Sequence, residues 1–266
     1  MRPNKRLGQH FLSDANILGR IADALDPGAG ETVIEVGPGH GSLTEILLAR
    51  GARVIAIEKD RALAEELRAR YAVRSEREDL VVVEGDALSV DWHSLAAHRA
   101  PRTAPGFKVI GNIPYNITSP LLEKALTAPL PERIVFLVQL EVARRIAAPP
   151  GSKTYGGLSI GVQVQCRVEE LFTVLPGSFR PPPKVKSALL RLTPLAEPLV
   201  RPQEVAPLRA FVAACFSRRR KQLKNAVPEG RPTAAELLAL GFDPKARPET
   251  LAPADFVRLL RWSQQL

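Results

Sequence analysis

Three glycines and two acidic residues stand where short apolar runs of the sequence end. Gly37, Gly39 and Gly41 follow the first run, Glu58 ends the next run 21 residues after Gly37, and Asp86 follows the third. Glycine lets the main chain take a positive φ and approach a ligand closely. An acidic residue about 20 residues further on can accept both hydroxyl groups of a ribose, and Asp86 is placed to accept from an adenine amino group. Together they predict a site for a nucleoside cofactor, whereas the glycines alone are also explained by a structural turn.

A second candidate site is the tetrapeptide Asn112-Ile113-Pro114-Tyr115, at the end of a fourth apolar run. The amino group of adenine is a poor nucleophile because its lone pair is delocalised into the ring. The side-chain oxygen of Asn112 and the main-chain carbonyl of Ile113 can accept its two hydrogens and direct the lone pair at an electrophile. Pro114 stiffens the turn, and Tyr115 can stack on the base. No strong base is needed, because the alkylated product loses its proton readily. The alternative is an ordinary turn in which Tyr115 only packs.

The charge of the chain points to a polyanionic partner. The 266 residues include 37 Lys and Arg against 28 Asp and Glu, a net charge of +9 with a pI near 9.9. Residues 195–266 hold 12 of the basic and 7 of the acidic residues. Such an excess favours binding of nucleic acid or of an acidic membrane surface, although an Arg-rich genome also produces it.

Five of these basic residues lie close together on one predicted helix: Arg218, Arg219, Arg220, Lys221 and Lys224. Four successive positive charges without an interleaved acid are unfavourable unless a partner such as phosphate neutralises them. Because successive helical residues diverge by about 100°, we expect two or three of the five to contact phosphates of the partner. The alternative is a solvated helix face.

Several other classes of protein are excluded. No stretch approaches the ~20 uninterrupted apolar residues that a membrane span needs, and the N-terminus has no apolar core of a secretory signal. Two cysteines, Cys166 and Cys215, cannot form a disulfide framework, and the four histidines show no metal-binding spacing. We therefore expect a cytoplasmic protein that needs no metal and no membrane.

The elements that must position these residues alternate between strands and helices. This alternation predicts a mainly parallel sheet that is covered on both faces and binds ligands at the carboxyl ends of its strands. The expected strands are residues 32–36, 53–57, 80–84, 107–111 and 134–138, followed by β-rich stretches at 165–174 and 186–192.

The pattern changes after Pro194. Residues 195–207 are rich in proline and are expected to form a linker, and only helices follow, at about 208–225, 234–240 and 253–263. The sequence therefore predicts an α/β domain over residues 1–194 and a small all-helical domain over residues 195–266.

Motifs along nearly the whole chain resemble the ribosomal RNA adenine dimethyltransferases, the KsgA family, which are related to the Erm methylases. The family is indicated jointly by Lys5-Arg6-Leu7-Gly8-Gln9-His10-Phe11-Leu12, Glu35-Val36-Gly37-Pro38-Gly39, Asn112-Ile113-Pro114-Tyr115, Phe179-Arg180-Pro181-Pro182-Pro183-Lys184-Val185 and Phe216-Ser217-Arg218-Arg219-Arg220-Lys221-Gln222-Leu223-Lys224-Asn225.

The resemblance implies a Rossmann-like methyltransferase sheet, S-adenosylmethionine as methyl donor and N6,N6-dimethyladenosine as product. It implies that His10, Leu12 and Asn112 contact the donor, and that Phe179 stacks on the target adenine opposite Tyr115. His10 departs from the asparagine that many relatives have there. The implied partner is small-subunit (16S) ribosomal RNA in a 30S assembly intermediate, bound by a monomer.

Three rival functions remain to be weighed. A nicotinamide oxidoreductase shares the glycine-rich turn and the acidic ribose contact, but it does not predict Asn112–Tyr115 or the three prolines after Arg180. A non-catalytic nucleic-acid-binding relative does not need the intact donor and adenine motifs. An Erm-type enzyme acting on large-subunit RNA is disfavoured by the motif Phe216–Asn225.

Overall fold

The computed structural model describes residues 9–72, 79–98, 106–228 and 232–264, so Lys5–Gly8 of the first motif lie outside the described residues. Two compact units emerge from the packing. Residues 1–143 and 169–194 form the first, here called the sheet unit, and residues 144–168 and 195–266 form the second, here called the helical unit. Each unit is described by itself.

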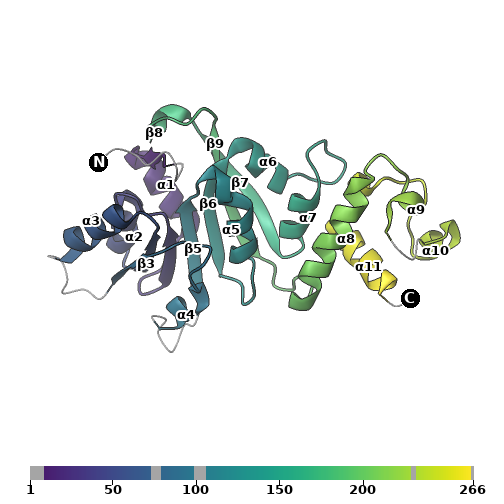
Figure 1. Cartoon of the computed structure of the whole chain (residues 1–266), viewed down its shortest axis with the longest axis horizontal. Helices are drawn as coiled ribbons and strands as arrows, with labels where there is room; N and C mark the ends of the chain where they lie inside the picture. The colour runs from purple at the N-terminus through teal and green to yellow at the C-terminus, as the bar shows by residue number, and fades with distance from the viewer. Residues whose placement is uncertain (1–8, 73–78, 99–105, 229–231, 265–266) are drawn as a thin grey trace. The chain divides into compact units, whose positions relative to one another are not determined.

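The sheet unit is built on a mixed sheet (Figure 1), whose parallel part carries the predicted strands. Among the described residues it has seven strands in the order β4-β3-β2-β5-β6-β9-β7. The first five strands in this order are parallel, and β9 runs antiparallel to β6. The bounds are β2 Thr32–Val36, β3 Arg53–Glu58, β4 Leu80–Glu84, β5 Phe107–Asn112, β6 Arg133–Gln139, β7 Cys166–Val174 and β9 Ser187–Pro194. The predicted α/β fold is therefore confirmed.

Helices connect and flank these strands. The first begins after Asp14, whose carboxylate accepts hydrogen bonds from the main-chain N–H groups of Asn16 and Ile17 and so caps the helix. The apolar side of this helix, including Ile21 and Leu25, belongs to the core of the sheet unit. The helices are α1 Ala15–Leu25, α2 Ser42–Ala49, α3 Arg61–Ala72, α4 Trp92–Ala97, α5 Thr118–Ala125 and α6 Leu140–Ile146, with the short 3-10 helices η2 Tyr115–Ile117 and η3 Pro176–Ser178.

A second, two-stranded sheet ties the N-terminal segment to residues far along the chain. In it, β1 (Phe11–Leu12) pairs antiparallel with β8 (Phe179–Arg180), with Phe11 opposite Arg180 and Leu12 opposite Phe179. The N–H of Ser13 also donates to the carbonyl of Ser178, at 3.1 Å. These contacts fix residues 10–13 beside the carboxyl ends of the large sheet.

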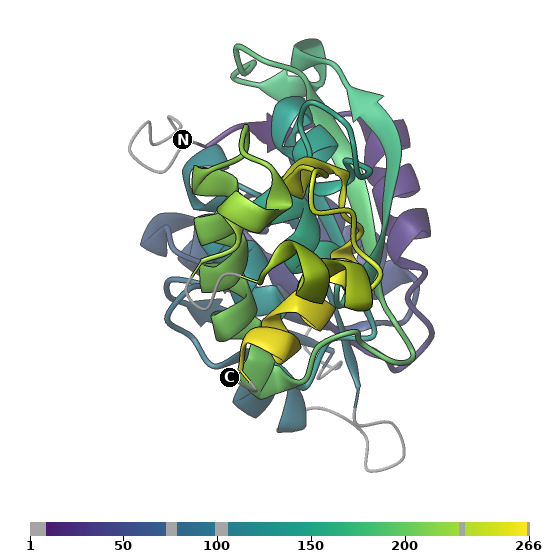
Figure 2. The same ribbon diagram turned by 90° about the vertical axis from the view of Figure 1, so that its right-hand side faces the viewer.

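The helical unit has its own apolar core, in which Tyr155, Leu208, Cys215 and Phe256 are buried. Figure 2 looks onto this unit, with its later helices in green to yellow. Its elements are α7 Gly157–Gln163, α8 Val205–Ser217, α9 Leu223–Ala226, α10 Ala234–Ala239 and α11 Pro253–Ser263, with η4 Pro202–Glu204 and η5 Pro248–Thr250. The domain boundary at 194/195 stays a prediction, and residues 144–168 group with this unit by packing.

Two expectations about the helical unit are wrong. The segment expected as a linker is held in place: the N–H groups of Leu195 and Leu199 donate to the carbonyls of Gln165 and Val164, both at 2.8 Å, and Val200 is buried. The expected helix over 208–225 is broken, since α8 ends at Ser217 and α9 begins at Leu223.

Arg218–Lys221 therefore lie in the turn between α8 and α9, and Lys224 lies in α9; these five cations are here called the basic turn. Within it, the N–H of Lys221 donates to the carbonyl of Arg218, at 2.8 Å, which is the i to i−3 spacing of a tight turn. This turn lets Leu223 and Val227 reach the apolar core, where both are fully buried. Burial of these two side chains accounts for the break.

Candidate active site

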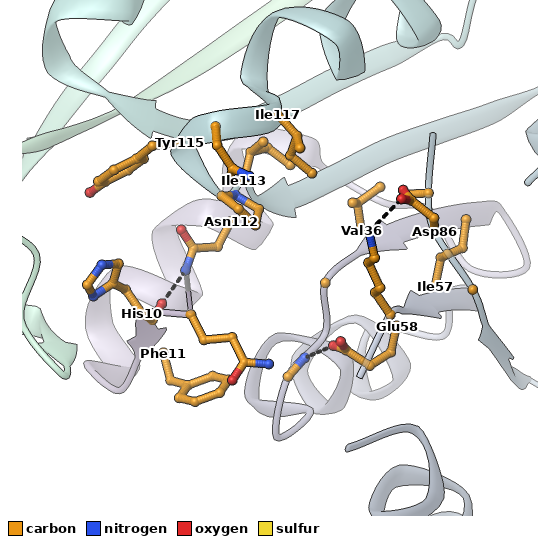
Figure 3. A pocket seen from close by; sticks show the side chains of 18 residues that line it. His10, Phe11, Val36, Ile57, Glu58, Asp86, Asn112, Ile113, Tyr115 and Ile117 are labelled. Atoms are coloured by element: carbon orange, nitrogen blue, oxygen red, sulfur yellow. Dashed lines mark hydrogen bonds and ion pairs between the residues drawn. The ribbon is translucent and has the colours of Figure 1, made fainter. Parts of the chain in front are cut away.

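The cavity that collects most of the predicted site residues lies at the carboxyl ends of β2, β3, β4 and β5 (Figure 3). The position follows from the parallel order of these strands, which brings their ends to one edge of the sheet. Nine residues predicted from the sequence line it: His10, Gly37, Gly39, Glu58, Asp86, Asn112, Ile113, Pro114 and Tyr115. Leu12 lines a second, neighbouring cavity that shares Phe11, Gly37 and Asn112 with the first.

The turn after β2 needs its glycines. Gly37 and Gly39 have φ values of 68° and 57°, in the left-handed region. A β-carbon on Gly39 would lie 2.9 Å from the ring of Phe11, too close for a real contact. Residue 39 therefore stays a glycine so that the N-terminal segment can lie directly over the turn.

Glu58 is held by the main chain around it. Its Oε2 accepts from the N–H of Gly39 at 3.1 Å, and its Oε1 accepts from the N–H of Asp60 at 2.8 Å. Burial raises the pKa of the Glu58 carboxyl, and these two hydrogen bonds oppose the rise. Because a carboxylate has about four acceptor sites, it retains sites that can accept hydroxyl groups from the cavity.

Asp86 is an ionised acceptor at the far end of the same cavity. Its Oδ2 accepts from the ammonium of Lys59 at 2.7 Å, and its Oδ1 accepts from the N–H of Leu88 at 2.9 Å. The hydrogen bond from Lys59 lowers the pKa of Asp86, with a smaller contribution from Leu88. The carboxylate is thus charged and oriented at neutral pH.

The amide of Asn112 has a fixed orientation. Its Nδ2 donates to the main-chain carbonyl oxygen of His10 at 2.8 Å. A carbonyl oxygen only accepts hydrogen bonds, so the nitrogen must be the atom that faces it. The amide oxygen then lies on the Tyr115 side of the cavity, as Figure 3 shows, where it can accept from an amino group.

Tyr115 lies beside this oxygen, and both its hydroxyl and its ring have contacts. Its hydroxyl hydrogen-bonds with the hydroxyl of Ser187 at 3.0 Å. Its ring lies 6.0 Å from the ring of His10, with an angle of 28° between the planes. Nδ1 of His10 lies 2.8 Å from the carbonyl oxygen of Pro181, so it carries the proton. The half-buried Tyr115 ring is therefore a rigid wall of the cavity.

Phe179 belongs to the core of the sheet unit. It is 2% exposed and packs with Leu12 in the core of the sheet unit. Stacking of Phe179 on a target base stays a prediction, and it requires the ring to leave this packing.

Two polar residues near the site are not among the site residues predicted above, although Glu35 belongs to one of the quoted motifs. Lys59 lines the first cavity and pairs with Asp86. Glu35 lines the second cavity, is 2% exposed and accepts from the hydroxyl of Thr44 at 2.6 Å. Burial raises the pKa of Glu35 to about 7, although the hydrogen bond from Thr44 opposes the rise. The signal in the sequence is a single acidic residue inside the apolar run Thr32–Val36.

The five basic residues of the helical unit differ in their surroundings. Arg218, Arg220, Lys221 and Lys224 are exposed. Arg219 turns inward: its guanidinium donates to the carbonyls of Ser152 and Lys153, at 3.3 and 3.1 Å, and approaches Glu249 at 3.8 Å. Four of the five can therefore meet an external phosphate as they stand.

Neither a metal centre nor a membrane span is found in the part of the chain that the structure describes. No group of three or more His, Cys, Asp or Glu side chains there could hold a metal ion. No helix there is both long and apolar enough to cross a membrane.

Known proteins resemble this chain over nearly its whole length. A family model described as "Ribosomal RNA adenine dimethylase" matches residues 1–265. The "Ribosomal RNA small subunit methyltransferase A" of Pseudomonas aeruginosa is 43% identical over 261 residues, which cover 97% of this chain and 93% of that protein. The protein of the same name from Pseudomonas putida is 44% identical over 259 residues, which cover 97% and 94%.

Solved structures of two RNA-modifying or adenosine-modifying transferases also resemble this chain over nearly its whole length. A dimethyladenosine transferase from Plasmodium falciparum superposes with a TM-score of 0.81 at 29% identity, covering 96% of this chain and 98% of that one. The 23S rRNA methyltransferase ErmE superposes with a TM-score of 0.73, also at 29% identity, covering 96% and 100%. The likeness therefore extends beyond the residues of the sheet unit alone.

Proposed function

The chain belongs to the ribosomal RNA adenine dimethylase family, and we propose that it transfers methyl groups from S-adenosylmethionine to N6 of adenosines in small-subunit ribosomal RNA. The product is N6,N6-dimethyladenosine. The observation that carries the proposal is the fixed amide of Asn112, whose oxygen faces the cavity beside Tyr115. The names of relatives at 43% and 44% identity support the choice of the small subunit.

The residues around the first cavity fit the donor. S-adenosylmethionine, when bound, supplies an electrophilic methyl group on a positively charged sulfur. Glu58 accepts ribose hydroxyls, and Asp86 accepts from the adenine amino group. At Gly37 a β-carbon would have only the carbonyl oxygen of Asn112 within 4 Å, at 3.9 Å, so the missing side chain leaves room for a ligand against the main chain. His10, Leu12 and Asn112 would provide further contacts with the donor, Leu12 from the neighbouring cavity.

On the acceptor side, this chain acts by orientation. The amide oxygen of Asn112 and the carbonyl of Ile113 accept the two hydrogens of the target amino group and direct its lone pair at the donor. Pro114 fixes the turn, and Tyr115 stacks on the base, joined by Phe179 if that ring moves out of the core. The target adenosine must be unpaired or flipped, because its amino group is otherwise hidden in a duplex.

Action on large-subunit RNA is the second candidate, favoured by the likeness to ErmE. The same arrangement of donor and acceptor residues serves both substrates. The names of the relatives favour the small subunit.

We further propose that the partner is a 30S assembly intermediate, that the protein acts on it as a monomer, and that this happens in the cytoplasm, where the subunits are assembled. The exposed cations Arg218, Arg220, Lys221 and Lys224 support contact with a large RNA surface.

The deciding experiment supplies donor labelled in its methyl group to the protein together with either 30S particles that lack adenine dimethylation or large-subunit RNA. We expect label on adenosines of the 30S particle, recovered as N6,N6-dimethyladenosine after nuclease digestion. Label only on large-subunit RNA would replace the small-subunit assignment with the second candidate. Label on neither would refute both.

A further inference from the structure

The segment between β7 and β9 carries three exposed cations and no acidic residue. Arg180, Lys184 and Lys186, here called the loop cations, lie within residues 175–187, and all three are exposed. Two exposed apolar side chains, Leu175 (58%) and Val185 (45%), stand in the same segment. The surface is thus cationic with apolar residues between the charges.

The loop cations have no carboxylate partner among the described residues, unlike most other cations of the sheet unit. Eight other basic side chains described in this unit form ion pairs, and the closest link Arg50 to Asp23, Lys59 to Asp86 and Lys108 to Glu31, at 2.5 to 2.7 Å. The remaining five are Arg61, Arg68, Arg70, Arg133 and Arg191. Unneutralised positive charge is therefore gathered on this segment.

The segment is attached to the walls of the active site. Arg180 pairs with Phe11 in the two-stranded sheet, and Arg180 and Pro181 line the second cavity together with Asn112. Glu35 also lines that cavity, and its carboxyl accepts a hydrogen bond from the hydroxyl of Thr44.

At its other end, the segment is joined to the acceptor side. The carbonyl of Lys186 accepts from the N–H of Leu140 at 3.0 Å, and Ser187 hydrogen-bonds with Tyr115. The cations thus stand beside the place proposed for the target base. Three prolines, at positions 181, 182 and 183, restrict the main chain between these anchors, so little freedom is lost when a ligand binds.

We propose that Arg180, Lys184 and Lys186 bind the phosphates of the RNA nucleotides next to the target adenosine. The inference rests on the proposed function and adds a second RNA contact, located on the sheet unit and independent of the basic turn of the helical unit. The loop cations hold the backbone on either side of the base, while Asn112 and Tyr115 hold the base itself. Phosphate contacts of this kind position a substrate without reading its sequence.

A different anion could account for one of the three residues. Arg180 lines a cavity beside Asn112, so it could instead bind the carboxylate of the donor. That reading predicts weaker donor binding when Arg180 is changed. The proposal predicts unchanged donor binding.

The test is the salt dependence of binding to 30S particles that lack the modification, for the wild type and for the triple variant Arg180→Gln, Lys184→Gln, Lys186→Gln. Each phosphate contact contributes about 0.7–0.9 to the slope of log affinity against log salt, so between about 50 and 200 mM salt the wild type should lose about 20- to 40-fold more affinity than the variant. A matched control, Arg53→Gln, Arg61→Gln, Arg68→Gln, removes the same charge from the start of β3 and from α3 and should keep the wild-type slope.

Donor affinity, measured by calorimetry, should be the same in all three proteins. Equal slopes for the triple variant and the wild type would overturn the proposal, and so would a loss of donor affinity in the triple variant. Should the triple variant fail to fold, the single variants Lys184→Gln and Lys186→Gln decide, each with an expected slope change of about 0.7–0.9. If the slopes of the wild type and the triple variant differ as expected but the wild type methylates nothing, the proposed function fails, and only the contact of the loop cations with RNA phosphates is retained.

Discussion

The carboxamide nitrogen of Asn112 lies 2.8 Å from the main-chain carbonyl oxygen of His10. This contact orients the amide through an atom that every residue possesses, so it does not depend on the side chain at position 10. The same contact is therefore available to the histidine that stands at this position. The imidazole has a separate contact, with the carbonyl of Pro181.

Replacing Asn112 by Ala should therefore lower the rate of methyl transfer much more than the affinity for the donor. Loss of an oriented polar group of this kind costs about 10²–10³-fold in rate. Single-turnover methylation of 30S particles measures the rate, and calorimetry measures the donor affinity. As a control, His10→Asn keeps the main-chain carbonyl and should keep most of the rate. Near-normal turnover of Asn112→Ala would rule out the orienting mechanism.

Phe179 should matter both for stability and for RNA. Because its ring is 2% exposed in the core, Phe179→Ala should destabilise the protein by about 3–5 kcal/mol, measured by urea unfolding. Phe179→Leu preserves most of the packing but removes the aromatic face. If the ring also stacks on the target base, Phe179→Leu should weaken productive RNA binding by about 1–3 kcal/mol, while Phe179→Tyr should not. Equal RNA binding by the Leu and Tyr variants would leave packing as the only role.

Glu35 should make the stability of the protein depend on pH. Its pKa is 4.5 in the reference state and about 7 in the folded protein, so the folded state binds more protons between these values. Stability is then lost as the pH rises from about 4.5 to about 7. The difference between the two pKa values corresponds to a loss on the order of 3 kcal/mol in the free energy of unfolding.

The comparison that isolates this effect is Glu35→Gln against the wild type. Relative to the wild type, the variant should gain stability as the pH increases across this window, and any constant cost of the amide cancels. Urea unfolding of both proteins at about pH 5 and about pH 8 measures the change. A difference that stays constant with pH would show that Glu35 does not titrate in this range.

The basic turn should divide into two functions. Neutralising Arg218, Arg220, Lys221 and Lys224 should flatten the salt dependence of binding to the 30S particle and leave donor binding intact, because these side chains are exposed. Arg219→Gln should instead lower the melting temperature, since it removes the bonds to residues 152 and 153. A salt titration with thermal unfolding of both variants distinguishes the two. A full loss of salt dependence from Arg219→Gln alone would contradict this division.

The sequence predicts the strand ends well because each depends on a local pattern. Glu58, Asp86 and Asn112 each stand at or just beyond the end of an apolar run, and the parallel order of the strands brings them to one cavity. Glu58 and Asn112 are also the last residues of β3 and β5.

Features that depend on distant residues are not predictable in this way. The pairing of Leu12 with Phe179 joins segments more than 160 residues apart, and it is this pairing that places Phe179 in the core. The turn at Arg218–Lys221 is required by the burial of Leu223 and Val227, whereas the local pattern predicts a continuous helix. In both cases tertiary packing overrides the local signal.

The pairing of β1 with β8 also bears on when the enzyme becomes competent as it is synthesised. Residues 11 and 12 leave the ribosome long before residues 179 and 180 have been made, so their partner strand is missing for most of translation. Until then, the segment of His10 lacks its contacts with Ser178, Arg180 and Pro181, although the amide of Asn112 can already bind the carbonyl of His10. A nascent chain therefore cannot complete its catalytic centre before the last strands of the sheet unit emerge, and an enzyme that modifies ribosomal RNA stays inactive while most of it is still being made.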